Sequence, residues 1–558
     1  MGVLAVRASA AGEILLLDEG LSFWGGVDPA TGQIIDANHP QHGASLAGRI
    51  VMMPTSRGSC TGSGVLLELA LNGHAPAALV FRESEDILTL GALIAGRMFD
   101  RPLAVVRLGS ADYAALAGEA TARIDDRVLV AGALRLELVE ASAEGLALSE
   151  TDRAILNGAT GKAAQLAMEV TCTMAAGQGA ERLTDVSRVH IDGCIYASPA
   201  NLRFAEAMAE MGGQVVIPTT MNAISVDREN WQSQGVPQLF GDPASRLADA
   251  YVTMGAKPSF TCAPYLLEER PSEGEDIAWA ESNAVIYANS VLGARTVKHP
   301  DFLDLFIALT GRAPFSGVYL QGNRRPARVV EVTVPGQPDD GFWPMLGWLV
   351  GQAAPDCIPL IRGVDHLQPN EDDLKGLCAA FGTTSAAPML HVAGVTPEAD
   401  LLPMEGAEVV TLDAADFARV WAQFNAGGGK VDLVALGSPH FSLTECHRLV
   451  EALDGRLCDP ATTTLVTLGR ATLAAAKADG TLTALEAAGV QVVPDICWCS
   501  ISEPVFPPEA KVLMTNSGKY AHYAPGLCGR AVRFGGLQAC AETAVSGVAP
   551  EGLPDWLG

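Results

Sequence analysis

Residues 54–64, with the sequence PTSRGSCTGSG, bring one cation, several hydroxyls and three glycines together between two apolar runs. The run before this stretch is typical of a buried strand, and the run after it is typical of a helix. Such a turn places backbone N–H groups at the positive end of a helix, where anions are stabilised. Ser59 is the hydroxyl in this field and Arg57 is its neighbouring cation, so Ser59 is a candidate active-site group. The alternative is a structural turn in which Ser63 caps the helix.

The chain has twelve cysteines but no CxxC pair, which argues against a disulfide framework and against a ferredoxin motif. Most of the cysteines lie in apolar helical stretches and are interpreted as packing residues. Cys262, Cys497 and Cys499 instead lie in turns that are flanked by proline or follow a strand. Three thiolates with an open fourth position suit an iron–sulfur cluster in which one iron acts as a Lewis acid. Spacing alone leaves simple packing open for these three as well.

Strands and helices alternate within the first 140 residues, which predicts parallel pairing with right-handed crossovers. The pattern predicts strands over 48–53, 77–81 and 102–106, helices over 63–72 and 85–98, and a closing hairpin over 123–138. Small and polar residues follow at 141–145 and mark a boundary. We therefore predict a small domain over residues 1–142 and a large region over residues 143–558.

Within the large region the alternation predicts several α/β subdomains, one of them doubly wound over about 380–520. The expected strands are 389–392, 408–412, 431–436, 464–467, 490–493 and 511–514, and the expected helices are 414–426, 442–453 and 470–487. Ligands of such sheets bind beyond the carboxyl ends of the strands. Polar turns lie there at 437–440, 495–499 and 515–519, and the last of these contains Lys519.

The charge balance is acidic, with 37 Lys and Arg against 64 Asp and Glu and a formal charge of −27. This argues against a nucleic-acid-binding surface. No apolar run reaches the roughly 18 residues that a membrane span needs. Arg7 and Glu13 interrupt the N-terminal stretch, unlike a signal peptide. We expect a cytoplasmic protein that acts on a small molecule, with neither nucleic acid nor membrane as a partner. The oligomeric state is not predicted.

Several short motifs carry a resemblance to a known family. They are FWGGVDPATG at 23–32, RGS at 57–59, HIDG at 190–193, PTTMN at 218–222, CAPY at 262–265, WAESN at 279–283, GSPH at 437–440, DIC at 495–497 and TNSGK at 515–519. On these residues the chain resembles the aconitase X family over essentially its full length. The resemblance implies an α/β protein with an N-terminal swivelling β/α domain, followed by a multi-domain, aconitase-like α/β/α catalytic part.

The resemblance also implies roles for individual residues. The family's catalytic serine corresponds to Ser59, and its substrate-contacting lysine corresponds to Lys519. The matching segments supply the candidate substrate-binding residues Gly193, Asn222, Glu281, Ser282, Ser438 and His440. The family's cluster ligands correspond to Cys262, Cys497 and position 438.

The chain departs from the family at that third position. Members with separate chains carry cysteine there, whereas this chain carries Ser438. Either Cys499 supplies the third ligand or the metal centre differs. Cys497 and Cys499 point the same way in an extended segment, which favours Cys499.

Fused members of the family are associated with cis-3-hydroxy-L-proline, and split members with 5-phosphomevalonate. The resemblance therefore implies a hydro-lyase that forms Δ1-pyrroline-2-carboxylate, with a [2Fe–2S] cluster as the Lewis acid. Ser59 would be the general base, supported by Arg57, and Lys519 would bind the carboxylate. A dehydratase of another hydroxy acid, such as 5-phosphomevalonate, and a non-catalytic iron–sulfur protein are the alternatives.

Overall fold

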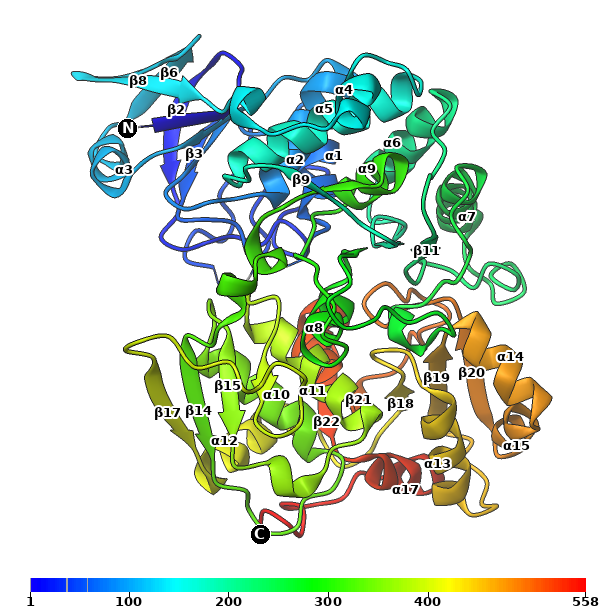
Figure 1. Ribbon diagram of the computed structural model, residues 1–558. Coiled ribbons are helices and arrows are strands. Elements are labelled where there is room, and N and C mark those ends of the chain that lie inside the picture. The colour runs from blue at the N-terminus through cyan, green and yellow to red at the C-terminus, as the bar shows by residue number, and fades with distance from the viewer. Residues whose placement is uncertain (1, 37–38, 58) are drawn as a thin grey trace. The chain divides into compact units, whose positions relative to one another are not determined.

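The structure is a computed structural model that describes residues 2–36, 39–57 and 59–558 of the 558-residue chain (Figure 1). The chain forms two compact units. Unit 1 comprises Met1–Thr219, Asp249–Ala256 and His299–Gly317, and unit 2 comprises Thr220–Ala248, Lys257–Lys298 and Val318–Gly558. The division at residues 142 and 143 remains a prediction.

The first part of unit 1 is a closed β-barrel with strand order β1-β5-β4-β3-β2-β6-β7-β8. Its strands are β1 (Gly2–Val6), β2 (Ala10–Leu16), β3 (Ile50–Met53), β4 (Ala78–Phe81), β5 (Ala104–Arg107), β6 (Thr121–Asp125), β7 (Val128–Ala131) and β8 (Leu134–Glu140). The predicted parallel pairing is confirmed for β3, β4 and β5, and β2 also pairs parallel with β3. All residues of β3 and β4 are buried, as expected for strands apolar on both faces.

Three helices lie between strands of the barrel in the sequence: α1 (Gly62–Asn72), α2 (Ile87–Phe99) and α3 (Ser110–Ala117). The first two pack closely, since a Cβ on Gly91 of α2 would lie 2.7 Å from the carbonyl oxygen of Ser63 in α1. Ser63 does not cap α1; Thr61 is the N-cap residue, and the Ser63 hydroxyl donates to the carbonyl of Ile87 at 2.9 Å. The hairpin expected over 123–138 consists of three strands joined by two turns.

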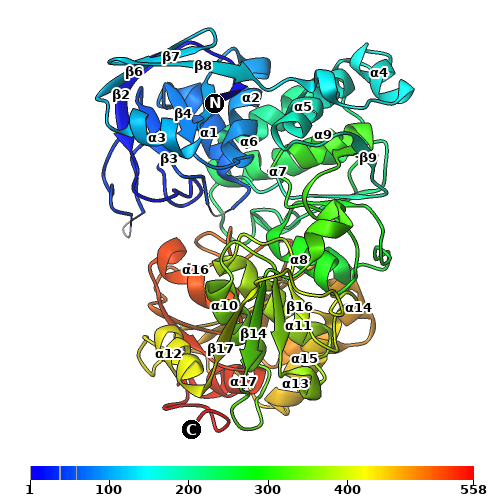
Figure 2. The same cartoon turned by 60° about the vertical axis from the view of Figure 1, so that its left-hand side comes forward.

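The remainder of unit 1 contributes helices from distant parts of the sequence (Figure 2). They are α4 (Glu150–Leu156), α5 (Lys162–Gly177), α6 (Pro199–Glu210) and α9 (Leu303–Thr310). Strand β13 (Arg312–Pro314) pairs with β9 (Leu183–Asp185), and Arg312 reaches the buried Asp152 with Nε at 2.8 Å from Oδ1. The segment around residue 300 is thereby tied to the N-terminal half of the chain.

Unit 2 contains two parallel sheets. The first has the order β16-β15-β14-β17, from β14 (Arg328–Val332), β15 (Pro359–Arg362), β16 (His391–Val392) and β17 (Glu408–Leu412). The second has the order β20-β19-β18-β21-β22, from β18 (Leu433–Leu436), β19 (Thr463–Leu468), β20 (Val490–Pro494), β21 (Val512–Thr515) and β22 (Ala531–Phe534). The strands expected in one doubly wound sheet over about 380–520 are therefore divided between two sheets. The pattern of apolar residues along a strand indicates which of its faces are buried. It does not indicate which other strand lies beside it in the sheet.

The helices expected over 414–426 and 442–453 are confirmed as two of the helices of unit 2. The helices of this unit are α8 (Ser282–Ser290), α10 (Phe342–Ala353), α11 (Glu371–Thr384), α12 (Ala414–Phe424), α13 (Leu443–Leu453), α14 (Arg470–Ala478), α15 (Thr481–Ala487), α16 (Gly518–Cys528) and α17 (Leu537–Ser546). The helix expected over 470–487 is two helices, because Gly480 adopts a left-handed conformation with φ of 87° and interrupts it. A shared core that includes Phe342, Trp348 and Phe417 buries nearly all of α10 and one face of α12.

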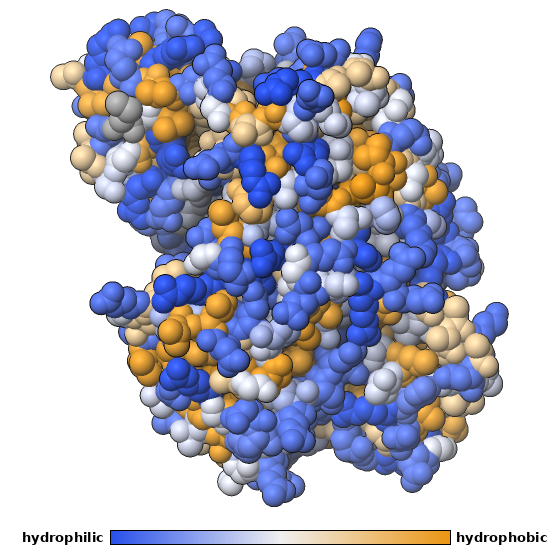
Figure 3. Space-filling view, viewed as in Figure 1, coloured by the Kyte–Doolittle hydropathy of each residue, from blue (hydrophilic) through white to orange (hydrophobic). Residues whose placement is uncertain are grey.

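The surface is mainly polar on the face drawn in Figure 3, with small apolar patches between the polar side chains. Among the described residues, no helix is both long enough and apolar enough to span a membrane.

Candidate active site

Three cysteines from two loops of unit 2 lie together. Cys262 precedes the short helix η2 (Pro264–Leu266), and Cys497 and Cys499 lie in the turn after β20. Cys262 and Cys497 form a small buried cluster with Ala223, and Cys499 packs against it. The fold thus brings into contact the three thiols that the sequence singled out.

His440 holds the two thiol-bearing loops together. Its backbone N–H donates to Cys262 Sγ at 3.3 Å, and its Nε2 lies 2.8 Å from the carbonyl oxygen of Ile496. A carbonyl only accepts, so Nε2 carries the proton, while Nδ1 lies 3.2 Å from the Thr261 hydroxyl. Burial lowers the pKa of His440, which keeps the ring neutral. Both ring nitrogens are therefore used to position the loops.

The three thiols interact electrostatically. Cys497 accepts hydrogen bonds from the thiols of Cys262 and Cys499, which lower its pKa well below the usual value despite burial. Burial raises the pKa of Cys262, and the hydrogen bond to Cys497 raises the pKa of Cys499. The backbone N–H of Cys499 lies 3.4 Å from Cys497 Sγ and supports the same charge. Cys497 is thus the thiol most readily deprotonated.

Lys519 and Glu281 form a buried ion pair near these thiols. Lys519 Nζ lies 2.8 Å from Glu281 Oε1, with both side chains less than a tenth exposed. Burial opposes the charge of Lys519, but Glu281 and the three cysteines raise its pKa well above the usual value. The second carboxylate oxygen of Glu281 accepts the N–H of Ala284 at 2.9 Å and so caps α8. One carboxylate therefore anchors a helix and orients the lysine.

Ser438 lies at the end of β18, in the turn that precedes His440. Its side chain is buried, and its hydroxyl has no hydrogen-bond partner among the residues that the structure describes. The same residue lines a cavity together with Lys375, Asn516 and Ser517, which lie in α11 and after β21. A buried hydroxyl without a partner is unfavourable unless a ligand or water completes it.

Ser59 and Arg57 belong to unit 1. Ser59 lies just before α1, and its hydroxyl donates to Thr61 Oγ1 at 3.1 Å. The side chain of Arg57 is about half exposed and forms an ion pair with Glu19, with Nη2 at 2.6 Å from Oε1. The positive charge expected beside Ser59 is therefore shared with a carboxylate.

The remaining candidate substrate-binding residues lie in different units and differ in burial. Gly193, in unit 1, donates its N–H to Asp304 Oδ2 at 3.4 Å and accepts from the Tyr251 hydroxyl at 3.2 Å. Asn222, in unit 2, is buried beside the thiol cluster, and its Oδ1 accepts the N–H of Ala223 at 2.7 Å. Ser282 is the partly buried first residue of α8.

Polar networks in unit 2 also contain residues that the sequence did not single out. Lys375 is buried between Glu445 and Asp372, 3.0 Å from Asp372 Oδ1, and donates to the carbonyl of His440 at 3.3 Å. Burial raises the pKa of Glu445 to about 7. No sequence signal marks this cluster, because its members lie on helices that meet only in the fold.

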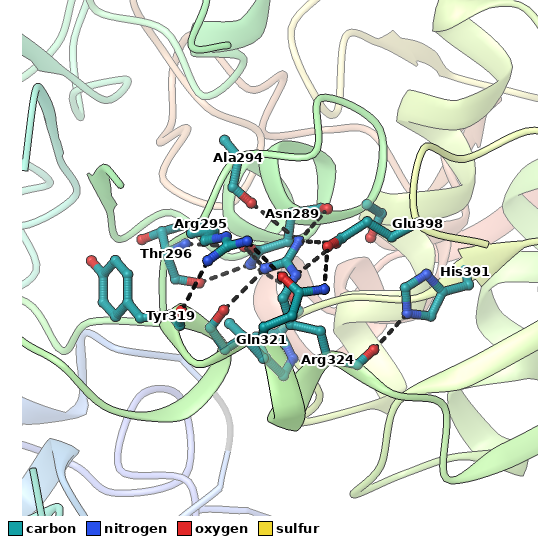
Figure 4. A network of polar contacts seen from close by, with 12 residues as sticks. Asn289, Ala294, Arg295, Thr296, Tyr319, Gln321, Arg324, His391 and Glu398 are labelled. Carbon is teal, nitrogen blue, oxygen red and sulfur yellow. Dashed lines mark hydrogen bonds and ion pairs between the residues drawn. The ribbon is translucent and has the colours of Figure 1, made fainter. Parts of the chain in front are cut away.

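A second network surrounds Arg324 and fixes the segment from Asn289 to Thr296 (Figure 4). The fully buried Arg324 donates to Glu398 Oε2 at 2.6 Å and to the carbonyls of Asn289 and Ala294 at 3.0 and 3.2 Å. His391 Nε2 lies 2.7 Å from the carbonyl of Arg324. These contacts hold the Asn289 and Ala294 carbonyls and the Arg324 backbone in place.

The donor set in the thiol cluster fits an iron–sulfur group. Soft thiolates are the ligands that such clusters use, and three lie in contact next to a buried cation. Within the described residues, no group of three or more His, Cys, Asp or Glu side chains is arranged to hold a metal ion, so the fit rests on the chemistry of the three thiols and on their contact.

Family models match almost the whole chain. The aconitase X swivel domain matches residues 2–131, the first domain 145–322, the second domain 326–422 and the third domain 431–546. The cis-3-hydroxy-L-proline dehydratase of Pseudomonas aeruginosa is 49% identical over 99% of this chain and 97% of its own. The enzyme of that name from Hypocrea jecorina is 46% identical over 100% of this chain and 97% of its own.

A solved structure has the same fold. The crystal structure of Thermococcus kodakaraensis aconitase X in its holo-form has a TM-score of 0.65 and 29% identity, and covers 72% of this chain and 100% of its own. Fold, thiol cluster and relatives together define an enzyme of the hydro-lyase class, a dehydratase. The chain belongs to the aconitase X family. The family implies an iron–sulfur cluster, and the predicted swivel domain and α/β catalytic part are confirmed.

Proposed function

We propose that this enzyme dehydrates cis-3-hydroxy-L-proline to Δ1-pyrroline-2-carboxylate. The observation that carries the proposal is the similarity, over nearly the full length of both chains, to two enzymes named for that substrate. Both matches span the swivel domain and all three further domains, so they include Ser59 and the three thiols. The substrate is a small amino acid whose carboxylate requires a cation.

Cys262, Cys497 and Cys499 would hold the cluster, which we expect to be [2Fe–2S]. Their contact in the fold supports Cys499 as the third ligand, in place of the cysteine that position 438 lacks. When bound, a cluster with an open coordination position supplies Lewis acidity toward the leaving C3 hydroxyl. Ser438 remains available as a hydrogen-bonding group for a ligand, because its hydroxyl lacks a partner in the described structure.

In this proposal Ser59 removes the proton from C2. A serine hydroxyl is a weak base, so it needs stabilisation by the N-terminus of α1 and a group to receive its own proton. Lys519 binds the substrate carboxylate; it has three donors, of which Glu281 engages one. Loss of the C2 proton and the C3 hydroxyl leaves an enamine, which tautomerises to the product. The proposal requires Ser59 and the thiols to act on one substrate molecule.

The ion pairs of two buried lysines argue against a phosphorylated substrate such as 5-phosphomevalonate. Lys519 is paired with Glu281, and Lys375 is paired with Asp372 and Glu445. A phosphate bound by either lysine would also face the carboxylate partners of that lysine. A substrate with a single carboxylate carries less negative charge than a phosphate, and Lys519 alone can pair with it.

The test is a substrate panel with anaerobically purified enzyme that has a loaded cluster. The expected result is water loss from cis-3-hydroxy-L-proline and none from the trans isomer, 4-hydroxyprolines or 5-phosphomevalonate. Ser59→Ala should bind substrate and lose turnover by a factor of roughly 10² or more. Ser63→Ala, which alters a neighbouring structural hydroxyl, is the matched control. Turnover of 5-phosphomevalonate alone, or full activity of Ser59→Ala, would overturn the proposal.

A further inference from the structure

Each of the two loops that carry the thiols contains a residue in a left-handed backbone conformation. Phe260, two residues before Cys262, has φ of 40°, and Asp495, two residues before Cys497, has φ of 72°. Both side chains are buried. A positive φ is uncommon outside glycine, and for a bulky residue such as phenylalanine it is strained, so contacts elsewhere in the fold must hold it. The direction of the chain before each of these two cysteines therefore depends on outside contacts.

The turn between β19 and α14 contacts both loops. The carbonyl oxygen of Leu468, the last residue of β19, accepts the N–H of Asp495 at 3.3 Å. Gly469, the N-cap residue of α14, lies so close to the other loop that a Cβ there would be 2.9 Å from Thr261 Cβ. Thr261 directly precedes Cys262. Consecutive residues of one turn thus lie against both thiol-bearing loops.

Arg470, the next residue, joins the two left-handed residues. Its Nη2 lies 2.6 Å from Asp495 Oδ2, and the side chain of Asp495 is 0% exposed. Its guanidinium carbon lies 5.8 Å from the centre of the Phe260 ring, within the range of a cation–π contact. Its other terminal nitrogen pairs with the exposed Glu229. The N–H of Arg228 also donates to Asp495 Oδ2, at 3.1 Å, and its guanidinium carbon lies 5.6 Å from the same ring centre.

The position of Arg470 is not explained by the helix that it begins. The helix dipole favours negative charge at the N-terminus of a helix and disfavours a cation there. Arg470 is the first residue of α14, and the first turn contains no acidic residue that would offset its charge. The contacts of Arg470 with Asp495 and Phe260 must therefore outweigh an unfavourable interaction with its own helix.

We propose that Arg470 is a positioning residue that holds the Cys262 loop and the Cys497 loop at the separation that an iron–sulfur cluster requires. The inference rests on the proposed ligand set of Cys262, Cys497 and Cys499. These ligands come from two loops that are distant in the sequence, so the fold must fix the distance between the loops. His440 provides one connection, through the Thr261 hydroxyl and the carbonyl of Ile496. Arg470 provides a second connection, which acts on the backbone direction of each loop.

Removal of the cluster from loaded enzyme by EDTA tests this role. Arg470→Met keeps an unbranched apolar stem and removes the charge. The variant should lose the visible absorption of the cluster at an EDTA concentration roughly 10- to 100-fold lower than the wild type does, as expected when a group behind metal ligands is removed. Arg470→Lys restores a charge for Asp495 and should recover part of this loss. Arg456→Met is the matched control, because Arg456 forms an ion pair with Glu542 of α17, with Nη1 at 2.7 Å from Oε2.

The cluster-free enzyme gives a second readout. Phenylarsine oxide bonds to two thiols that lie close together and releases water, and mass spectrometry of peptides identifies the bridged pair. In the wild type we expect bridges from Cys262 to the other loop as well as bridges between Cys497 and Cys499. Arg470→Met should lower the fraction of bridges between the loops and leave the bridges within one loop, because two residues of the same loop stay close whatever the distance between the loops. A general loss of packing does not predict this selectivity.

Gly469→Ala changes the same turn in a different way and serves as a second variant if Arg470→Met does not fold. The new Cβ would lie 2.9 Å from Thr261 Cβ and should displace the Cys262 loop, with the same selective loss of bridges between the loops.

The outcomes separate this inference from the proposed function. Unchanged EDTA resistance and unchanged bridging in Arg470→Met would overturn the inference, while a loaded wild type would leave the proposed ligands in place. An Arg470→Lys variant that loses its cluster as readily as Arg470→Met would also contradict the role given to the charge. If the wild type binds no cluster, the proposed cofactor fails, and the bridging experiment alone decides whether Arg470 holds the two loops together.

Discussion

Glu398→Gln removes one charge from a buried ion pair and leaves the side-chain shape almost unchanged. The side chain of Arg324 is 0% exposed and that of Glu398 is 15% exposed. The other donors of Arg324 face neutral carbonyls of Asn289, Ala294 and Val318 at 3.0 to 3.2 Å. After the substitution, a buried guanidinium keeps these acceptors and loses its counter-charge.

The size of the effect follows from this geometry. Removing one partner of a buried ion pair lowers the free energy of unfolding by about 3–5 kcal/mol. Three carbonyl acceptors remain and Glu398 is partly exposed, so we expect the lower end, about 3 kcal/mol. Glu331→Gln is the matched control, because Glu331 pairs with Arg362 at 3.2 Å with side chains 43% and 46% exposed. Exposed pairs contribute at most about 1 kcal/mol.

The effect should depend on pH with a definite sign. Burial opposes the charge of Glu398, but Arg324 lowers its pKa below the usual value. The stabilisation is therefore fully present above the unfolded pKa of about 4.3 and is lost as pH falls through the folded pKa. The difference between wild type and Glu398→Gln should shrink in that acidic range.

Urea unfolding followed by tryptophan fluorescence measures the change. Trp24 belongs to unit 1 and the other tryptophans belong to unit 2, so the signal follows the unit that contains Arg324. A chain with two units need not unfold in one step, and this local probe avoids assigning one free energy to both. If the midpoint at pH 7 moves no further for Glu398→Gln than for Glu331→Gln, the reasoning about the buried pair is wrong.

Three further predictions address the site and the packing. Cys499→Ser should remove the visible absorption of the cluster. Cys378→Ser, which changes a buried cysteine of α11, is the control and should retain that absorption. Lys519→Met should weaken binding of a planar carboxylate such as pyrrole-2-carboxylate by about tenfold or more in calorimetry, because hydrogen bonds to charged groups contribute about 1.5–3 kcal/mol; unchanged affinity would place the carboxylate elsewhere. Gly91→Ala should lower the thermal stability of unit 1, because the new Cβ would lie 2.7 Å from the Ser63 carbonyl, whereas Gly96→Ala, whose nearest neighbour is at 3.6 Å, should not.

The local structure was largely predictable from the sequence. The strand expected over 408–412 is β17, and the strand expected over 490–493 lies within β20. Short-range patterns determine such elements, because burial and turn residues are recorded in consecutive positions. Which strands share a sheet was not predictable. β16 and β17 pair with strands earlier in the chain, and a hydrophobic period carries no information about the partner.

In the candidate site, too, the local features were predictable from the sequence and the long-range contacts were not. Cys262, Cys497 and Cys499 were identifiable because all three lie in turns, and turns at strand ends meet in an α/β fold. The buried cluster of Lys375, Asp372 and Glu445 gave no signal, because Glu445 lies on α13 and contacts Lys375 of α11 only in the fold.

Proton removal and thiol chemistry depend on different units in the proposed function, which makes their roles separable. Ser59→Ala changes unit 1, so the enzyme should keep the visible absorption that depends on the three thiols of unit 2. Cys497→Ser should abolish that absorption. A loss of cluster absorption in Ser59→Ala would mean that this variant disturbs the fold of the enzyme, and its effect on turnover could then no longer be assigned to proton removal.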